Sequence, residues 1–303
     1  MNDSLGTLLV LLAATSSASK AIFVKLCYRG GVDATTALTL RMLLSLPFFV
    51  AAAAYDAWRG GGATPLTRRD VAAIVVLGLL GFYLSSLFDF MGLAYISAAL
   101  ERLILFTYPT FVVLLSAIFL RQRVTRGVAL ALAVSYGGMA LVFAHDAGGT
   151  TSHLWRGGAL VALSTLTYSS YLMGAGRLIA RLGPRRFTSL VMLVSSAAVF
   201  AQFGLTRDLG TLAEVTPAVW LYASAMAVVA TVMPVYLMSA GLARIGAART
   251  AMLSAIGPVI TIVLGAIFLG ERLTVVQCAG AALVIAGVWL STPRPGRRDA
   301  ARG

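Results

Sequence analysis

The chain has 303 residues, of which 59% are hydrophobic and only 12% are charged, and its mean hydropathy is +0.89. A soluble domain carries about 25% charged residues, so this composition excludes a soluble globular protein and indicates an all-α membrane protein. The formal net charge of +13 would suit a nucleic-acid-binding protein. The basic residues, however, are spread over alternate loops and form no single patch, so no nucleic-acid partner is expected.

Apolar runs separated by charged or Gly/Pro-containing breaks predict ten membrane-spanning helices. A run of about 20 apolar residues crosses the hydrocarbon core as a helix, because lipid offers the backbone no hydrogen-bond partner. The predicted spans are 5–25, 34–54, 71–91, 97–120, 126–143, 156–175, 187–204, 217–240, 246–269 and 274–291. The first could pass for a signal peptide, but no basic segment precedes it.

The chain contains an internal duplication. Residues 92–125 align without a gap on residues 241–274 at a constant offset of 149, which places Gly92 on Gly241 and Pro109 on Pro258. Duplicated halves in an apolar chain are typical of secondary transporters. We therefore expect a first repeat over 1–143, a second repeat over 156–291 and a basic tail over 292–303.

Basic residues mark one side of the membrane. Alternate breaks and the C-terminal tail hold 16 of them, the intervening breaks hold five (Lys25, Arg29, Arg156, Arg207 and Arg272), and three lie inside helices. Because positively charged loops stay in the cytoplasm, both termini are expected to be cytoplasmic, in a multi-pass protein of the bacterial-type cytoplasmic (inner) membrane. Five helices per repeat then force the two halves into opposite orientations.

The repeated blocks resemble the EamA family of the drug/metabolite transporter superfamily. The text AIFLGERLT followed by QCAGAALVIAGVWL carries the resemblance, and so do TYPTFVVLLSAIFLRQRVT in the first copy, ASKAIFVKL and ALTLRMLLSLPFF. The resemblance implies two inverted five-helix repeats around a central cavity, which is lined mainly by the first four helices of each repeat. It also implies peripheral fifth helices, through which some members dimerise, so a homodimer is left open.

This chain departs from the repeat in two places. Arg121, Gln122 and Arg123 stand where the second copy has Gly270, Glu271 and Arg272, which strengthens the positive charge of a cytoplasmic loop. The first copy also has Glu101 and Arg102 where the second copy has Thr250 and Ala251. The second departure puts charge into the expected substrate region.

Five ionisable residues fall inside or at the ends of the predicted spans: Lys20, Arg41, Asp89, Glu101 and Arg102. Each costs at least about 2.5–3.5 kcal/mol at a helix centre, so each requires pairing, water or a function. At about 1.5 Å rise per residue, Lys20 and Arg41 fall at a similar depth in the outer half of the membrane. The two acids can pair with the three bases, which leaves one positive charge over.

We expect Lys20 and Arg41 to bind substrate, together with Ser16, which shares a helical face with Lys20. Asp89 and Glu101 are interpreted either as structural counter-ions or as gating or proton-coupling groups. Arg102 lies near an interface and is expected to pair with an acid or to extend toward the headgroups, rather than to contact substrate.

The second repeat offers hydroxyl and aromatic groups in place of charge. Tyr168 and Tyr171 lie in the segment STLTYSSY, and Tyr236 lies further along; all three are candidate substrate ligands, although tyrosines more often serve packing. A cavity with charge on one wall and such groups on the other suits a zwitterion or an organic anion. The prolines Pro109, Pro234 and Pro258 are candidate hinges, with a static kink as the alternative.

No enzyme, metal or cofactor motif is present, and without a Walker A loop an ATP-driven pump is not expected. Cys27 and Cys278 are read as two buried free thiols, with a disulfide as the alternative. The sequence thus predicts a secondary transporter that exports small organic metabolites, such as amino acids or related amphipathic compounds, by alternating access. The alternatives are a flippase for lipids or lipid-linked sugars and a non-transporting membrane scaffold or sensor.

Overall fold

A computed structural model describes residues 3–58, 65–120, 126–147, 153–254, 256–271 and 274–291, and all regular structure in these residues is helical. The helices up to residue 147 are α1 (Asp3–Ala18), α2 (Lys20–Arg29), α3 (Ala34–Trp58), α4 (Arg68–Gly78), η1 (Leu79–Leu84), α5 (Ser85–Leu93), α6 (Ala98–Leu105), α7 (Tyr108–Leu120) and α8 (Arg126–Ala147). The helices after it are α9 (Leu154–Leu182), α10 (Pro184–Thr206), η2 (Leu209–Leu212), α11 (Pro217–Ala227), η3 (Val228–Val232), α12 (Met233–Ser254), α13 (Gly257–Leu264), η4 (Gly265–Leu269) and α14 (Val275–Ser291).

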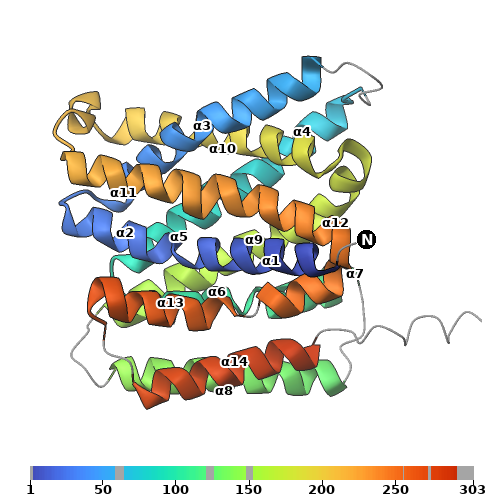
Figure 1. Ribbon diagram of the computed structural model, residues 1–303, viewed down its shortest axis with the longest axis vertical. Coiled ribbons are helices and arrows are strands. Elements are labelled where there is room, and N and C mark those ends of the chain that lie inside the picture. Colours follow the sequence, from blue (N-terminus) through green and yellow to red (C-terminus); the bar gives the residue numbers. More distant parts are fainter. Residues whose placement is uncertain are drawn as a thin grey trace, which may run out of the picture.

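The helices form one bundle in which most of them run along a common direction (Figure 1). The pair α8 and α14 packs together at one edge, and α3 packs on α10 at the opposite edge. Between these edges α1 packs along α12, and α5 packs along α9. Helices from the first half of the chain therefore pack repeatedly against helices from the second half.

Six helical segments of the described chain are long and apolar enough to cross a membrane. They are Ser4–Arg29, Ala34–Trp58, Arg68–Leu93, Ala98–Phe119, Pro184–Thr206 and Pro217–Met238. Shorter apolar helices cover Ala133–Val142, Gly257–Leu269 and Val275–Gly287. The predicted all-helical class is confirmed, together with several membrane-crossing helices, whereas the count of ten spans stays a prediction.

The structure differs from the predicted spans at one boundary. The sequence predicts a break between 240 and 246, but α12 continues to Ser254, and the next helix begins at Gly257. In the first half the corresponding break is present, because the Ser97 hydroxyl accepts a hydrogen bond from the Leu100 amide at 3.1 Å and caps α6. The aligned residue of the second half is Gly246, which has no side chain to cap a new helix.

Glycines allow the closest helix contacts between the two halves. A Cβ atom on Gly92 of α5 would lie 3.0 Å from the carbonyl oxygen of Gly157 on α9. A Cβ atom on Gly241 of α12 would lie 3.2 Å from the carbonyl oxygen of Gly6 on α1. The two crossings are built from equivalent residues, because Gly241 follows Gly92 by the offset of the duplication. Small residues at such crossings let helices approach closely in lipid.

Two irregular turns follow the same offset. The π-helical segment η1 begins at Leu79, and η3 begins at Val228, 149 residues later. The helix α7 begins at Tyr108, and α13 begins at Gly257, again 149 residues later. A π-turn inserts an extra residue into a helix, bends it and often accompanies a functional site.

Substitution of Gly92 by alanine is expected to destabilise the bundle, because the added methyl group would overlap the α9 backbone and the Val161 side chain. Overpacking of this kind costs about 1–3 kcal/mol. Thermal unfolding of the purified protein should show a clear fall in Tm. Gly176→Ala is the matched control, because nothing lies within 4 Å of the position of its Cβ atom. An equal Tm for both variants would contradict this account of the crossing.

Candidate functional site

A bend between α1 and α2 positions Lys20. The hydroxyls of Ser16, Ser17 and Ser19 donate to the carbonyls of Ala13, Ala14 and Ser16 at 3.1, 3.0 and 2.6 Å. Serine hydroxyls that bond back to the helix in this way bend it. The Thr261 hydroxyl of α13 donates to the carbonyl oxygen of Ala18 at 3.0 Å. The bend therefore receives a hydrogen bond from the second half of the chain, directly before Lys20.

Lys20 forms ion pairs with both predicted acids. Its ammonium nitrogen contacts Asp89 Oδ2 and lies 3.0 Å from Glu101 Oε1. Glu101 is fully buried, and the Asp89 side chain is 4% exposed. The two carboxyl groups are close enough to hydrogen-bond to each other when one of them carries a proton. This arrangement holds one positive charge between two negative charges.

Helix ends place the two acids. Asp89 lies on α5 one turn before its end, and Glu101 lies in the first turn of α6. The α6 backbone is fixed from the second half of the chain, because Glu271 Oε1 accepts a hydrogen bond from the Ala98 amide at 3.0 Å. Lys25 Nζ lies 3.8 Å from the same oxygen.

Arg41 lies on the other side of α5 from Lys20. It is 5% exposed, and its Nη2 donates to the Ser86 hydroxyl at 2.8 Å. Its guanidinium carbon lies 5.1 Å from the centre of the Phe90 ring, a cation–π contact. Among the described residues no carboxylate lies within 4.0 Å of this side chain, and its Nε has no hydrogen-bond partner.

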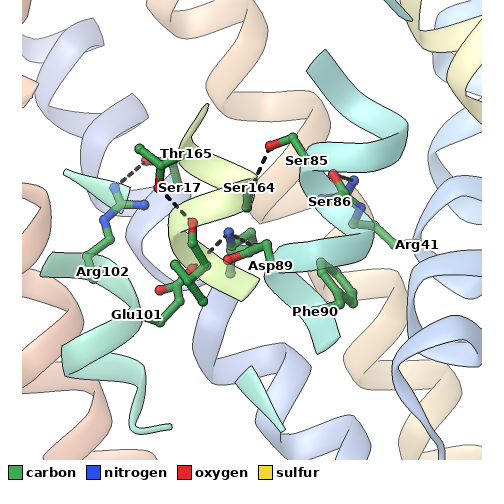
Figure 2. A network of polar contacts seen from close by, with 12 residues as sticks. Ser17, Arg41, Ser85, Ser86, Asp89, Phe90, Glu101, Arg102, Ser164 and Thr165 are labelled. Carbon is green, nitrogen blue, oxygen red and sulfur yellow. Dashed lines mark hydrogen bonds and ion pairs between the residues drawn. The ribbon is translucent and has the colours of Figure 1, made fainter. Parts of the chain in front are cut away.

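Arg102 also lacks an acidic partner within 4.0 Å in the described part of the chain. Its Nη2 donates to the Ser17 hydroxyl at 3.4 Å, a long hydrogen bond, and its Nε is buried without a partner. The guanidinium lies on the backbone of Gly257, where a Cβ atom would come within 2.8 Å of Nη2. Figure 2 shows Arg41 and Arg102 on opposite sides of Asp89 and Glu101.

Tyrosines of both halves adjoin the charged residues. The Tyr108 and Tyr168 rings pack edge to face with their centres 6.1 Å apart, and Arg102 lies within electrostatic range of both hydroxyls. Tyr168 stacks on Tyr171 at 5.7 Å. Tyr171 is buried in an apolar cluster and packs against Phe187 at 6.1 Å. Tyr168 thus adjoins the charged residues, whereas Tyr171 lies behind it in the core.

Two predicted substrate ligands lie apart from the charged residues. The Ser16 hydroxyl bonds to its own helix, and it is the neighbouring Ser17 that contacts Arg102. Tyr236 lies beside the ion pair of Asp56 with Arg185, near the end of α3. Their role as substrate ligands receives no contact that would support it.

The three predicted hinge prolines begin helices. Pro109 and Pro258 are the second residues of α7 and α13, and Pro234 is the second residue of α12, directly after the π-turn η3. In the first turn of a helix a proline costs no hydrogen bond. Only Pro234 continues an existing helix, so it is the proline whose missing amide coincides with a bend. The hinge role of all three stays a prediction.

Sequence reasoning did not single out Ser86, Ser164, Tyr108 or Gly257. Ser85 and Ser164 contact each other through their hydroxyls at 3.1 Å, and this contact joins α5 to α9 beside the acid pair. A signal for Ser86 was available, because it lies one helical turn before Asp89 on the same face. Gly257 left no signal, since its contact with Arg102 arises only from the packing of the two halves.

Both cysteines are free thiols. Cys27 is buried, as expected, but Cys278 is exposed, which corrects the expectation of two buried thiols. Cys278 lies on the face of α14 that α8 does not cover, and an apolar face of an edge helix is left for lipid.

The arrangement of repeated helices around buried charges agrees with comparisons to known proteins. The pattern of the EamA-like transporter family matches the chain twice, over residues 4–144 and 155–292. The chain belongs to the EamA-like transporter family. This membership confirms the predicted resemblance and identifies a multi-pass membrane protein of a transporter family.

Individual relatives of this EamA-like protein are also named as transporters. The uncharacterized transporter YcbK of Bacillus subtilis is 32% identical over 305 residues, which cover 97% of this chain and 96% of YcbK. An uncharacterized transporter of Archaeoglobus fulgidus is 28% identical over 236 residues, or 75% of this chain and 80% of that protein. A solved crystal structure with 19% identity has a TM-score of 0.66 and covers 95% of this chain and 96% of its own. It shows the same fold.

Proposed function

We propose that this protein is a secondary transporter that exports a small organic solute across the cytoplasmic membrane by alternating access. It would do so as ten spans in two inverted repeats, with both termini in the cytoplasm. The observation that carries the proposal is the buried group of Lys20, Arg41, Asp89, Glu101 and Arg102, called here the charge cluster. Ionisable side chains in membrane helices are costly and mark substrate or ion pathways.

The position of the charge cluster supports transport over a scaffold role. Lys20, Arg102, Tyr108 and Tyr168 lie deep in the bundle, yet each retains accessible surface. Accessible surface deep inside a protein means that side chains do not fill the interior there. A scaffold needs no such space, whereas a transporter needs it for the solute.

The recurrence of structural features at one offset supports the inverted repeat. The π-turns, the glycine crossings and the starts of α7 and α13 each occur once per half. Secondary transporters built from inverted repeats place the solute where the repeats meet. The contacts of Arg102 with Gly257 and of Ser85 with Ser164 join the two halves at such a place.

Comparison of metabolites between deletion and overexpressing cells tests the function. We expect at least one small organic metabolite to appear in the medium with the wild-type protein and to stay inside cells that carry Arg41→Ala. Loss of charge-assisted hydrogen bonds removes about 1.5–3 kcal/mol each, enough to weaken a small ligand about tenfold or more. Arg244→Ala is the control, because Arg244 is exposed and bonds to its own helix. Identical metabolite profiles in all strains would favour a scaffold or sensor.

Reporter fusions test the inverted topology. A fusion after residue 150 and a fusion at the C terminus are expected to lie on opposite sides of the membrane, because five spans separate them and basic residues favour a cytoplasmic C terminus. An enzyme reporter active only outside and a fluorescent reporter active only inside provide the readout. If both fusions report the same side, the five-plus-five architecture is incorrect.

A homodimer stays a prediction. The fifth helices of the two repeats, α8 and α14, pack on each other at the edge of the bundle, with Gly138 close to the carbonyl oxygen of Gly280. Their outward faces carry exposed apolar side chains, including Leu130, Leu141 and Leu290. Such faces suit either lipid or a second copy of the chain.

A further inference from the structure

The three cations of the charge cluster differ in how far their donors are used. Lys20 is held by two carboxylates, and Arg41 has a hydroxyl at 2.8 Å and an aromatic ring beneath it. Arg102 has only the 3.4 Å contact with Ser17. A buried guanidinium with so few partners is costly. Of the three, Arg102 is therefore the group that most needs a ligand.

The surroundings of Arg102 add positive potential. Its guanidinium lies on Gly257, the first residue of α13, and the N-cap residue Ile256 provides no side-chain acceptor for the amides that follow. The N-terminus of a helix carries a partial positive charge and attracts anions. A cation beside such a helix end is favourable only when an anion lies near both. The guanidinium and the helix start form one anion-binding element.

The charge of the cluster selects the class of anion. Three cations and two ionised acids leave one positive charge, so a monoanion neutralises the group and a dianion does not. The planar guanidinium matches the two oxygens of a carboxylate. Tyr108 and Tyr168, which are partly exposed beside Arg102, offer rings against which an apolar or cyclic body packs.

We propose that Arg102, Ser17 and the start of α13 bind the carboxylate of a monocarboxylate solute whose ring rests on Tyr108 and Tyr168. This proposal rests on the proposed transport function and names the chemical class of its substrate. It transfers the main anion-binding role from Lys20 to Arg102, and Lys20 becomes the partner of the two acids.

Binding of benzoate to the purified protein in lipid nanodiscs tests the site without a transport assay. Benzoate is expected to raise the Tm in a concentration-dependent way, as a ligand of the folded state does. Benzamide has the same ring without the charge, and phenylphosphonate has the ring with more negative charge. Both are expected to stabilise the protein less than benzoate. No shift with benzoate, or an equal shift with benzamide, overturns the proposal.

Two variants locate the site. Arg102→Gln is expected to raise the Kd for benzoate about tenfold or more, because charge-assisted hydrogen bonds are lost. Gly257→Ala keeps the charge but displaces the guanidinium, and it should weaken benzoate binding similarly. Gly176→Ala is the matched control and should bind benzoate as the wild type does. If Arg102→Gln does not fold, Gly257→Ala decides: unchanged benzoate binding in that variant overturns the proposal.

The outcomes separate this proposal from the proposed function. Benzoate binding that depends on Arg102, combined with identical metabolite profiles of deletion and overexpressing cells, would retain the site and reject export. Export that depends on Arg41, combined with no binding of benzoate, would retain the transporter and reject a monocarboxylate site at Arg102.

Discussion

Replacement of Lys20 by alanine is expected to abolish transport, with insertion into the membrane retained. Lys20 is the cation that both Asp89 and Glu101 contact, so its removal leaves two buried carboxylates without a partner. Removal of one member of a buried ion pair typically costs about 3–5 kcal/mol. Uptake or efflux in reconstituted vesicles, together with Tm and yield, would measure both effects.

A charge-balanced variant separates loss of function from loss of stability. Lys20→Met combined with Asp89→Asn and Glu101→Gln removes all three charges and is expected to recover much of the stability while transport stays absent. Lys25→Ala, five residues further along the same helix, should keep transport because Lys25 contacts Glu271 outside the charge cluster. Full transport by the neutral triple variant would reduce Lys20 and the acids to structural counter-ions.

Neutralisation of one acid is expected to uncouple transport from a pH gradient. Lys20 carries one positive charge against the two negative charges of Asp89 and Glu101, so uptake of one proton neutralises this group of three. Asp89 Oδ1 and Glu101 Oε2 have no hydrogen-bond partner in the described structure, which leaves room for that proton. Asp89→Asn or Glu101→Gln should therefore abolish pH-driven accumulation and preserve substrate exchange.

The measurement compares accumulation and counterflow in proteoliposomes with and without an imposed pH gradient. Asp56→Asn is a suitable control, because Asp56 pairs with Arg185 outside the charge cluster. Retention of full pH-driven accumulation by both acid variants would show that neither acid carries the proton. A wild-type protein that ignores the pH gradient would instead be a facilitator, and the acids would serve only as partners of Lys20.

The sequence was sufficient for features that depend on local pattern. Apolar runs, repeated blocks and the isolated charges of Lys20, Asp89 and Glu101 are each visible in the one-dimensional text. Proximity of these three was expected from their depths along separate helices, and the ion pairs agree with it. Depth along a helix follows from the rise per residue alone, so this part of the site could be anticipated.

Features that depend on rotation and packing could not be predicted. Ser16 and Ser17 differ by about 100° around the helix axis at 3.6 residues per turn, and the bend at Ser19 decides which of them faces Arg102. The contact of Arg102 with Gly257 requires the placement of two helices that are 155 residues apart in the chain (257 − 102). The expected pairing of Arg102 with an acid is not seen for the same reason, since Lys20 occupies both acids.

The two halves of this bundle repeat each other in shape but not in charge, since Thr250 and Ala251 stand at the places of Glu101 and Arg102. A solute that passes through it therefore meets an asymmetric electric profile. The resting potential, negative inside, drives a monoanion outward with about 2.3 kcal/mol per 100 mV, equivalent to a concentration ratio of about 50. Export of such an anion needs no further energy source, and the membrane voltage gives transport its direction.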